Sequence, residues 1–142
     1  MPVASEDFRR AHGEIRRQTE ALCRAAREIP HLSYADRAAV RDAVLDFLHR
    51  EVEPHTRLDE RLLYPEVASR LGAPLATASM AYDHLAIRHW IDDLSTADPA
   101  DPDRLQELLY GLDALMRVHI WKENELYLPI VESAVWPAGV GS

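Results

Sequence analysis

Two short stretches of the sequence each place a histidine four residues before an acid. They are His55 with Asp59, and His119 with Glu123. Four residues correspond to about one turn of an α-helix, so both side chains of a pair can reach a single ion. An ionised acid on an otherwise apolar helix face is costly to bury unless it is paired or bound to a metal. Imidazole with carboxylate and no thiolate favours iron, and manganese or zinc less well.

Two further histidines, His12 and His84, each lie upstream of one of these pairs. The two neighbourhoods, residues 55–65 and 119–129, align without a gap, and histidine, acid, leucine and proline recur at the same offsets. A duplicated helical hairpin would place two ligand sets opposite each other, which favours two metal ions over one. Six side chains leave coordination positions open for solvent, an oxo or hydroxo bridge, or an exogenous ligand. The expected metal ligands are His12, His55, Asp59, His84, His119 and Glu123.

The same residues also have a plainer interpretation. A histidine on an apolar stripe is commonly a core residue with a hydrogen-bond partner, and an acid–histidine pair can be buried without metal. Four inward histidines, one per helix, satisfy each other poorly without a cation, which favours the metal site. A bundle with structural zinc or no metal is the alternative. The remaining histidines and two nearby acids fall off the inward faces and are expected at the surface: His31, His49, His89, Glu60 and Glu125.

Four stretches with apolar residues three and four apart predict the helices that would hold these ligands. They span about residues 6–29, 33–71, 75–94 and 104–129. No stretch alternates with period two for long enough to predict a strand. Short connections between four helices favour an all-α, up-down-up-down four-helix bundle.

Local signals refine these helices. Ser33 resembles an N-cap, and Pro54 and Pro65 predict kinks inside the second helix. At about 100° per residue, Leu62 shares the inward face of His55, and Leu126 shares that of His119.

Length and composition limit the class of protein. The 142 residues fit a single domain over residues 1–142, with the bundle over about 5–132 and a short C-terminal tail. The formal net charge of -8 makes nucleic acid and membranes poor partners. The single cysteine, Cys23, is expected to be a core thiol and not a ligand. Without an apolar leader or a long apolar run, the chain is expected in the cytoplasm.

The paired motif resembles that of the hemerythrin-like, or HHE cation-binding, family. The hallmark of that family is His…His-x-x-x-Glu repeated twice, with a Leu-Tyr-Pro-like stretch after each acid. Here those stretches are Leu63-Tyr64-Pro65 and Leu126-Tyr127-Leu128-Pro129. The resemblance covers about residues 5–132. It implies a non-heme di-iron centre in which Asp59 and Glu123 bridge the ions.

The sequence departs from the family pattern at two places. Asp59 stands where the family usually has glutamate, which shortens its reach. Oxygen-carrying hemerythrins also have two histidines four apart on the third helix, whereas Met80 and Arg88 flank His84 at that spacing. The open position would be left to water or to one of three side chains: His89, Glu60 or Tyr82.

The resemblance implies a protein that binds or reacts with a small oxidant: oxygen, hydrogen peroxide or nitric oxide. The alternative is an iron- or oxygen-sensing regulatory module without turnover. The sequence identifies no catalytic residue, proton donor or protein partner. An apolar wall is expected to exclude water from the centre: Ile15, Leu48, Val52, Ile87, Ile91 and Leu115.

Overall fold

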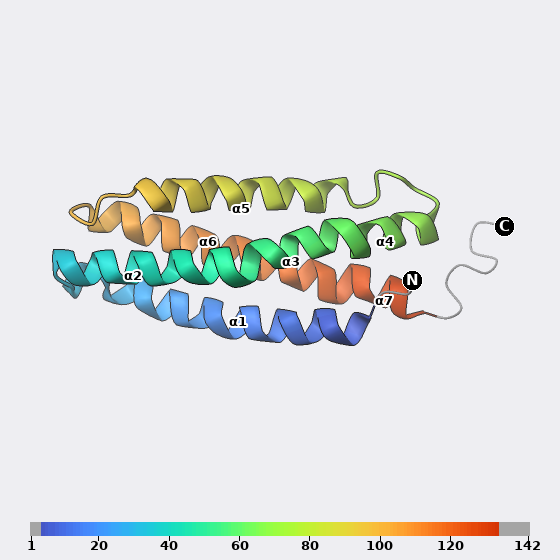
Figure 1. The fold of residues 1–142 in the computed structure, drawn as a ribbon, viewed down its shortest axis with the longest axis horizontal. Helices are drawn as coiled ribbons and strands as arrows, with labels where there is room; N and C mark the ends of the chain where they lie inside the picture. The colour runs from blue at the N-terminus through green and yellow to red at the C-terminus, as the bar shows by residue number, and fades with distance from the viewer. Residues whose placement is uncertain (1–3, 134–142) are drawn as a thin grey trace.

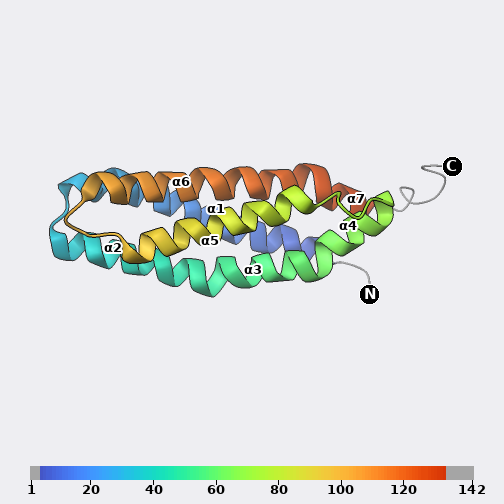
Figure 2. The same ribbon diagram turned by 90° about the horizontal axis from the view of Figure 1, so that it is seen from above.

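The computed structural model describes residues 4–133, which form four helical rods and contain no strand. Successive rods run in opposite directions, and the first and last rods lie side by side (Figures 1 and 2). The predicted all-α, up-down-up-down four-helix bundle is confirmed. No helix within this part of the chain combines the length and the apolar character that a bilayer crossing demands. The predicted C-terminal tail lies outside the described residues. The rods consist of α1 (Ser5–Glu28); α2 (Tyr34–Phe47), α3 (Glu53–Leu58) and α4 (Tyr64–Leu71); α5 (Ala78–Thr96); and α6 (Pro102–Lys122) with α7 (Leu128–Glu132).

Side-chain caps and one glycine set the ends of the rods. Ser33 and Asp101 each accept a hydrogen bond from the backbone N–H three residues on, at 3.1 Å, so α2 and α6 begin with an acceptor for a free amide. Gly72 ends α4 with φ of 62°, in the left-handed region that favours glycine. Helix α5 begins at Ala78, later than predicted, because residues 73–77 form turns.

Three widened, π-helical turns interrupt the second and fourth rods: η2 (Leu48–Val52), η3 (Asp59–Leu63) and η4 (Glu123–Tyr127). A proline follows two residues after each turn, at positions 54, 65 and 129. Proline has no N–H to donate, and its ring clashes with the carbonyl four residues before it. The i→i+5 hydrogen bonds of a π-turn relieve this conflict. The kinks predicted at Pro54 and Pro65 are therefore widened turns, and the rod bends gently so that α4 is inclined to α2 (Figure 1).

Each widened turn shifts the inward face of its rod by one or two residues. Leu62 and Leu126, predicted to face inward, are 42% and 55% exposed. Their places in the core are taken by Leu63 and Leu128, which are fully buried. The prediction was wrong at these two positions because it assumed 100° per residue through the turn.

Two apolar clusters fill the bundle, and a polar layer separates them. Along α1, His12 lies between Phe8 of the smaller cluster and Ile15 of the larger one. The other three inward histidines lie between the two clusters along their own rods in the same way. The polar layer is thus closed off from water on both sides. The smaller cluster consists of Phe8, Leu63, Tyr64, Val67, Met80 and Leu128.

Candidate metal centre

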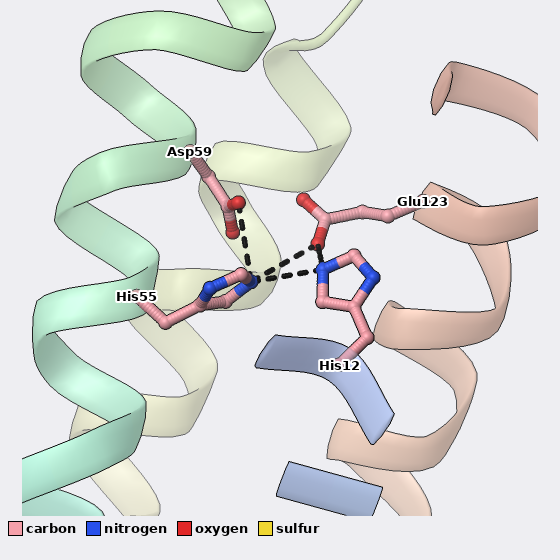
Figure 3. A group of neighbouring side chains, drawn as sticks. All are labelled: His12, His55, Asp59 and Glu123. Atoms are coloured by element: carbon pink, nitrogen blue, oxygen red, sulfur yellow. Dashed lines mark hydrogen bonds and ion pairs between the residues drawn. The ribbon is translucent and has the colours of Figure 1, made fainter. Parts of the chain in front are cut away.

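The six side chains predicted as metal ligands meet in the polar layer. Figure 3 shows His12 of α1, His55 of α3, Asp59 at the start of η3 and Glu123 at the start of η4 pointing toward one another. Their ligand atoms all lie within 4.8 Å of one another. The same two acids form a second group of this kind with His84 and His119. All six side chains are buried.

Each acid presents one oxygen to each pair of histidines. Asp59 places Oδ1 3.3 Å from His55 Nε2 and Oδ2 3.3 Å from His84 Nε2. Glu123 places Oε1 3.0 Å from His12 Nε2 and Oε2 3.6 Å from His119 Nε2. Carboxylates placed in this way can be shared by two ions. The shorter aspartate therefore still reaches both histidine pairs.

Acceptors behind two of the histidines fix which ring nitrogen faces inward. Nδ1 of His84 lies 3.0 Å from Glu60 Oε1, and Nδ1 of His119 lies 3.0 Å from Asp83 Oδ2. An ionised carboxylate only accepts hydrogen bonds, so the ring nitrogen that faces it carries the proton. The lone pair of each ring is then on Nε2, which points into the site.

The inward lone pairs lie close together. His84 Nε2 and His119 Nε2 are 3.0 Å apart. In the other pair, Nδ1 of His12 donates to Asn124 Oδ1 at 2.6 Å, and its Nε2 lies 2.9 Å from His55 Nε2. The lone pairs of His84 and His119 repel each other at this distance, whereas a cation between the two rings would be bound by both.

Three buried carboxylate oxygens in this layer have no hydrogen-bond partner: both oxygens of Asp59 and Oε1 of Glu123. A buried carboxyl oxygen without a hydrogen-bond partner is costly, and binding to a metal ion removes the cost. The donor set, its orientation and these orphaned oxygens fit a buried metal site.

The two acids differ in their affinity for protons. Burial and the nearby Glu123 carboxylate raise the pKa of Asp59 to about 11. Burial alone would also raise the pKa of Glu123, but the adjacent His12 and His55 outweigh it and hold that pKa below its ordinary value. Burial lowers the pKa of His55 and of His84, which favours the neutral imidazole that binds metal.

A comparison with protein families adds independent evidence. Residues 3–131 match the family described as the hemerythrin HHE cation binding domain. The chain belongs to this family. The match covers every element of this hemerythrin-like bundle that contributes to the polar layer. Comparisons with curated proteins and with solved structures found no match.

Tyr64 belongs to the hemerythrin-like centre, although the sequence did not predict it there. Tyr64 is 4% exposed and donates its phenol hydrogen to Glu123 Oε2 at 2.7 Å. The hydroxyl oxygen of Tyr64 lies 3.0 Å from His84 Nε2 and 3.3 Å from His119 Nε2. Burial, with the charges of Glu123 and Asp59, raises the pKa of Tyr64, so the phenol keeps its proton. Asp59 lies five residues before Tyr64, and the widened turn brings both to one face; Pro65 is the sequence signal for that turn.

The side chains suggested for the open position do not reach it. Tyr82 is 71% exposed, and His89 is exposed on α5. Glu60 is exposed, as predicted, but it also contacts the outer nitrogen of His84, which was not predicted. Met80 is fully buried in the smaller apolar cluster.

The remaining surface and core predictions are confirmed in part. His31 and His49 are exposed, and Glu125 is exposed next to Asn124. Cys23 belongs to neither ligand group, but it is half-buried beside Arg27 and is not a core residue.

A small cavity of about 10 Å³ lies against the centre, between His55 and His119. Its size is close to the minimum that holds one water molecule. Of the predicted apolar wall, three residues line it: Ile15, Val52 and Ile87. Leu48 and Ile91 are buried elsewhere in the larger cluster. Leu115 is only half-buried, and Met116 lines the cavity in its place.

Proposed function

We propose that this hemerythrin-like protein holds two iron ions and binds or reacts with a small oxidant: oxygen, hydrogen peroxide or nitric oxide. The observation that carries the proposal is the sharing of two buried carboxylates between two histidine pairs. Nitrogen and oxygen donors without thiolate suit iron, and manganese or zinc less well. When bound, a pair of irons supplies reversible one-electron chemistry at the centre.

The protein contributes a fixed, dry frame. The four histidines would hold one ion between each pair, and Asp59 with Glu123 would keep the spacing of the ions constant. Leu63 and Val67 on one side and Ile15 and Ile87 on the other keep bulk water away. The cavity between His55 and His119 is about the size of one water molecule and has an apolar lining, which favours small neutral oxidants.

Tyr64 is the candidate for the proton that peroxide or oxygen reduction needs. Its phenol is protonated, buried and hydrogen-bonded to a shared carboxylate within the centre. Cations bound beside Asp59 and Glu123 would offset the carboxylate charges that help to raise the pKa of the phenol, and the proton on its Oη could then pass to an adjacent oxygen without entry of bulk water.

Metal analysis with an optical spectrum of the purified protein tests this function. Two irons per chain with near-ultraviolet oxo-to-iron absorption would support it, whereas one zinc, or no metal after loading with iron, would rule it out. Peroxide consumption by the wild type that is lost in His119→Ala would indicate an enzyme. Stoichiometric binding of the oxidant without turnover would instead favour the sensing module.

A further inference from the structure

The two halves of the bundle carry their histidines and acids in the same order, but the groups behind their histidines differ. In each half the residue directly after the shared acid contacts the outer nitrogen of a histidine on another rod. After Glu123 this residue is Asn124, which contacts His12. After Asp59 it is Glu60, which contacts His84. The position is equivalent in the two halves, yet one side chain is a neutral amide and the other a carboxylate.

A second matched position shows the same difference. The residue directly before His84 is Asp83, whose Oδ2 accepts from His119 Nδ1 at 3.0 Å and from Lys122 Nζ at 2.6 Å. The residue directly before His12 is Ala11, which has no acceptor to offer. Within residues 4–133, no side chain is hydrogen-bonded to Nδ1 of the corresponding His55.

A third matched position lies inside the centre. Tyr64 follows Asp59 by five residues and places its hydroxyl oxygen beside His84 and His119. Leu128 follows Glu123 by five residues and is buried hydrocarbon. All three differences therefore add a charged or polar group to the same half of the site.

We propose that the two metal positions are unequal, and that the position between His84 and His119 binds its ion more tightly and fills first. A carboxylate that accepts the Nδ1–H of a histidine ligand raises the basicity of the ring and fixes its orientation. Both histidines of this position have such a carboxylate, whereas the position between His12 and His55 has one amide. Glu60 and Asp83 are positioning residues for the tight site, and the other site is the exchangeable one. This inference rests on the proposed metal binding.

Titration of the full-length, metal-free protein with Co(II) tests the inequality, because Co(II) absorbs visible light and resists oxidation by air in such sites. Calorimetry with a competing chelator would give the two affinities. We expect two binding steps, one for each metal position, whose affinities differ by about 10-fold or more. His84→Ala should remove the tight step, and His12→Ala should remove the weak one; circular dichroism checks that both variants fold.

The sequence itself supplies the matched variants. Glu60→Asn and Asp83→Ala copy the weak half into the tight half, and each should weaken the tight step by about 10–100-fold while sparing the weak one. Asn124→Glu and Ala11→Asp are the reciprocal changes and should strengthen the weak step. Asp83→Glu keeps the carboxylate, so its tight position should bind more strongly than that of Asp83→Ala. Glu20→Gln removes a charge from the exposed face of α1 and should leave both steps unchanged.

The outcomes separate this inference from the function on which it rests. Two equal steps, or loss of the tight step in His12→Ala but not in His84→Ala, would overturn the inequality and leave the metal centre intact. Unchanged affinities in both Glu60→Asn and Asp83→Ala would do the same. Failure to bind Co(II) or Fe(II) at all would overturn both.

Discussion

Tyr64 and Glu123 are joined by a buried hydrogen bond of 2.7 Å between the phenol and Oε2. The two residues come from opposite halves of the bundle, and Glu123 also faces three of the inward histidines. The bond links the only polar group of the smaller apolar cluster, among the residues described, to the shared carboxylate. It gives the centre a protonated oxygen that is not one of the six predicted ligands.

Tyr64→Phe removes this oxygen and keeps the ring. The ring still packs against its neighbours, but the buried Glu123 carboxylate loses a donor, so the free energy of unfolding should fall by about 1.5–3 kcal/mol. If the phenol supplies protons, peroxide consumption should fall by about 100-fold or more. Stopped-flow assays with iron-loaded protein and a denaturant titration measure both effects. Full activity in the variant would show that protons reach the centre from another group.

Asp59→Asn separates metal binding from stability. The amide keeps the shape of the side chain but removes the charge that would be shared by two ions. Metal affinity should fall by more than the roughly 10–100-fold expected from loss of an outer hydrogen-bond partner. The metal-free variant should melt at or above the temperature of the wild type, because a neutral amide replaces the buried Asp59 carboxyl, which has no hydrogen-bond partner. Calorimetric melting with and without metal gives both quantities, and a lower melting temperature for the metal-free variant would contradict this account.

The raised pKa of Asp59 also predicts a pH dependence. Its ordinary value is 3.8, and in the folded metal-free protein it is about 11. Between these values the folded state holds a proton that the unfolded state has released, so the free energy of unfolding must fall as pH rises. We expect the metal-free protein to lose stability from pH 7 to pH 10, above the range in which histidines titrate. Asp59→Asn should show a smaller loss over the same range.

Metal uptake should release the same proton. At pH 7 a cation that binds both oxygens of Asp59 must displace it, so uptake by the wild type should acidify a weakly buffered solution. A pH indicator during Co(II) titration measures the release. An equal release by Asp59→Asn would assign the proton to another group.

Gly111 and Gly13 form a matched pair for testing how helix packing affects the stability of the bundle. A Cβ at Gly111 would overlap the ring of Trp90, whereas a Cβ at Gly13 would have no atom within 4 Å. Gly111→Ala should destabilise the bundle by about 1–3 kcal/mol by forcing α5 from α6. Gly13→Ala should stabilise it by about 0.5–1 kcal/mol, because glycine disfavours a helix interior. Denaturant unfolding measures both, and stabilisation by Gly111→Ala would show that Trp90 moves without cost.

The six central side chains could be predicted because the pattern that identifies them involves residues close together in the sequence. A histidine and an acid four residues apart share a helix face in any α-helix, and both pairs obey this rule. The single inward histidine of α1 and of α5 follows from the same periodicity. These positions required no knowledge of how the rods face one another.

The residues that were missed depend on geometry that periodicity does not contain. To predict the contact of Asp83 with His119, one must know how α5 is aligned along α6. To predict the contact of Glu60 with His84, one must know how the second rod is aligned along α5. Glu60 was correctly placed at the surface, yet an exposed carboxylate still reaches a buried ring. Tyr64 was missed because an i→i+5 turn, not an α-helical one, brings it to Asp59.

The widened turns at Asp59 and Glu123 make the rods intolerant of changes in length at the two places where the acids lie. Each turn contains one residue more than a regular α-helical turn, and the proline beyond it would clash with the carbonyl four residues before it if the turn closed to α-helical winding. Deleting a single residue between Glu60 and Leu63 would rotate the remainder of the rod by about a quarter turn and carry Tyr64 out of the centre. The same deletion in the loop over residues 97–101 would leave every side chain of the centre in phase.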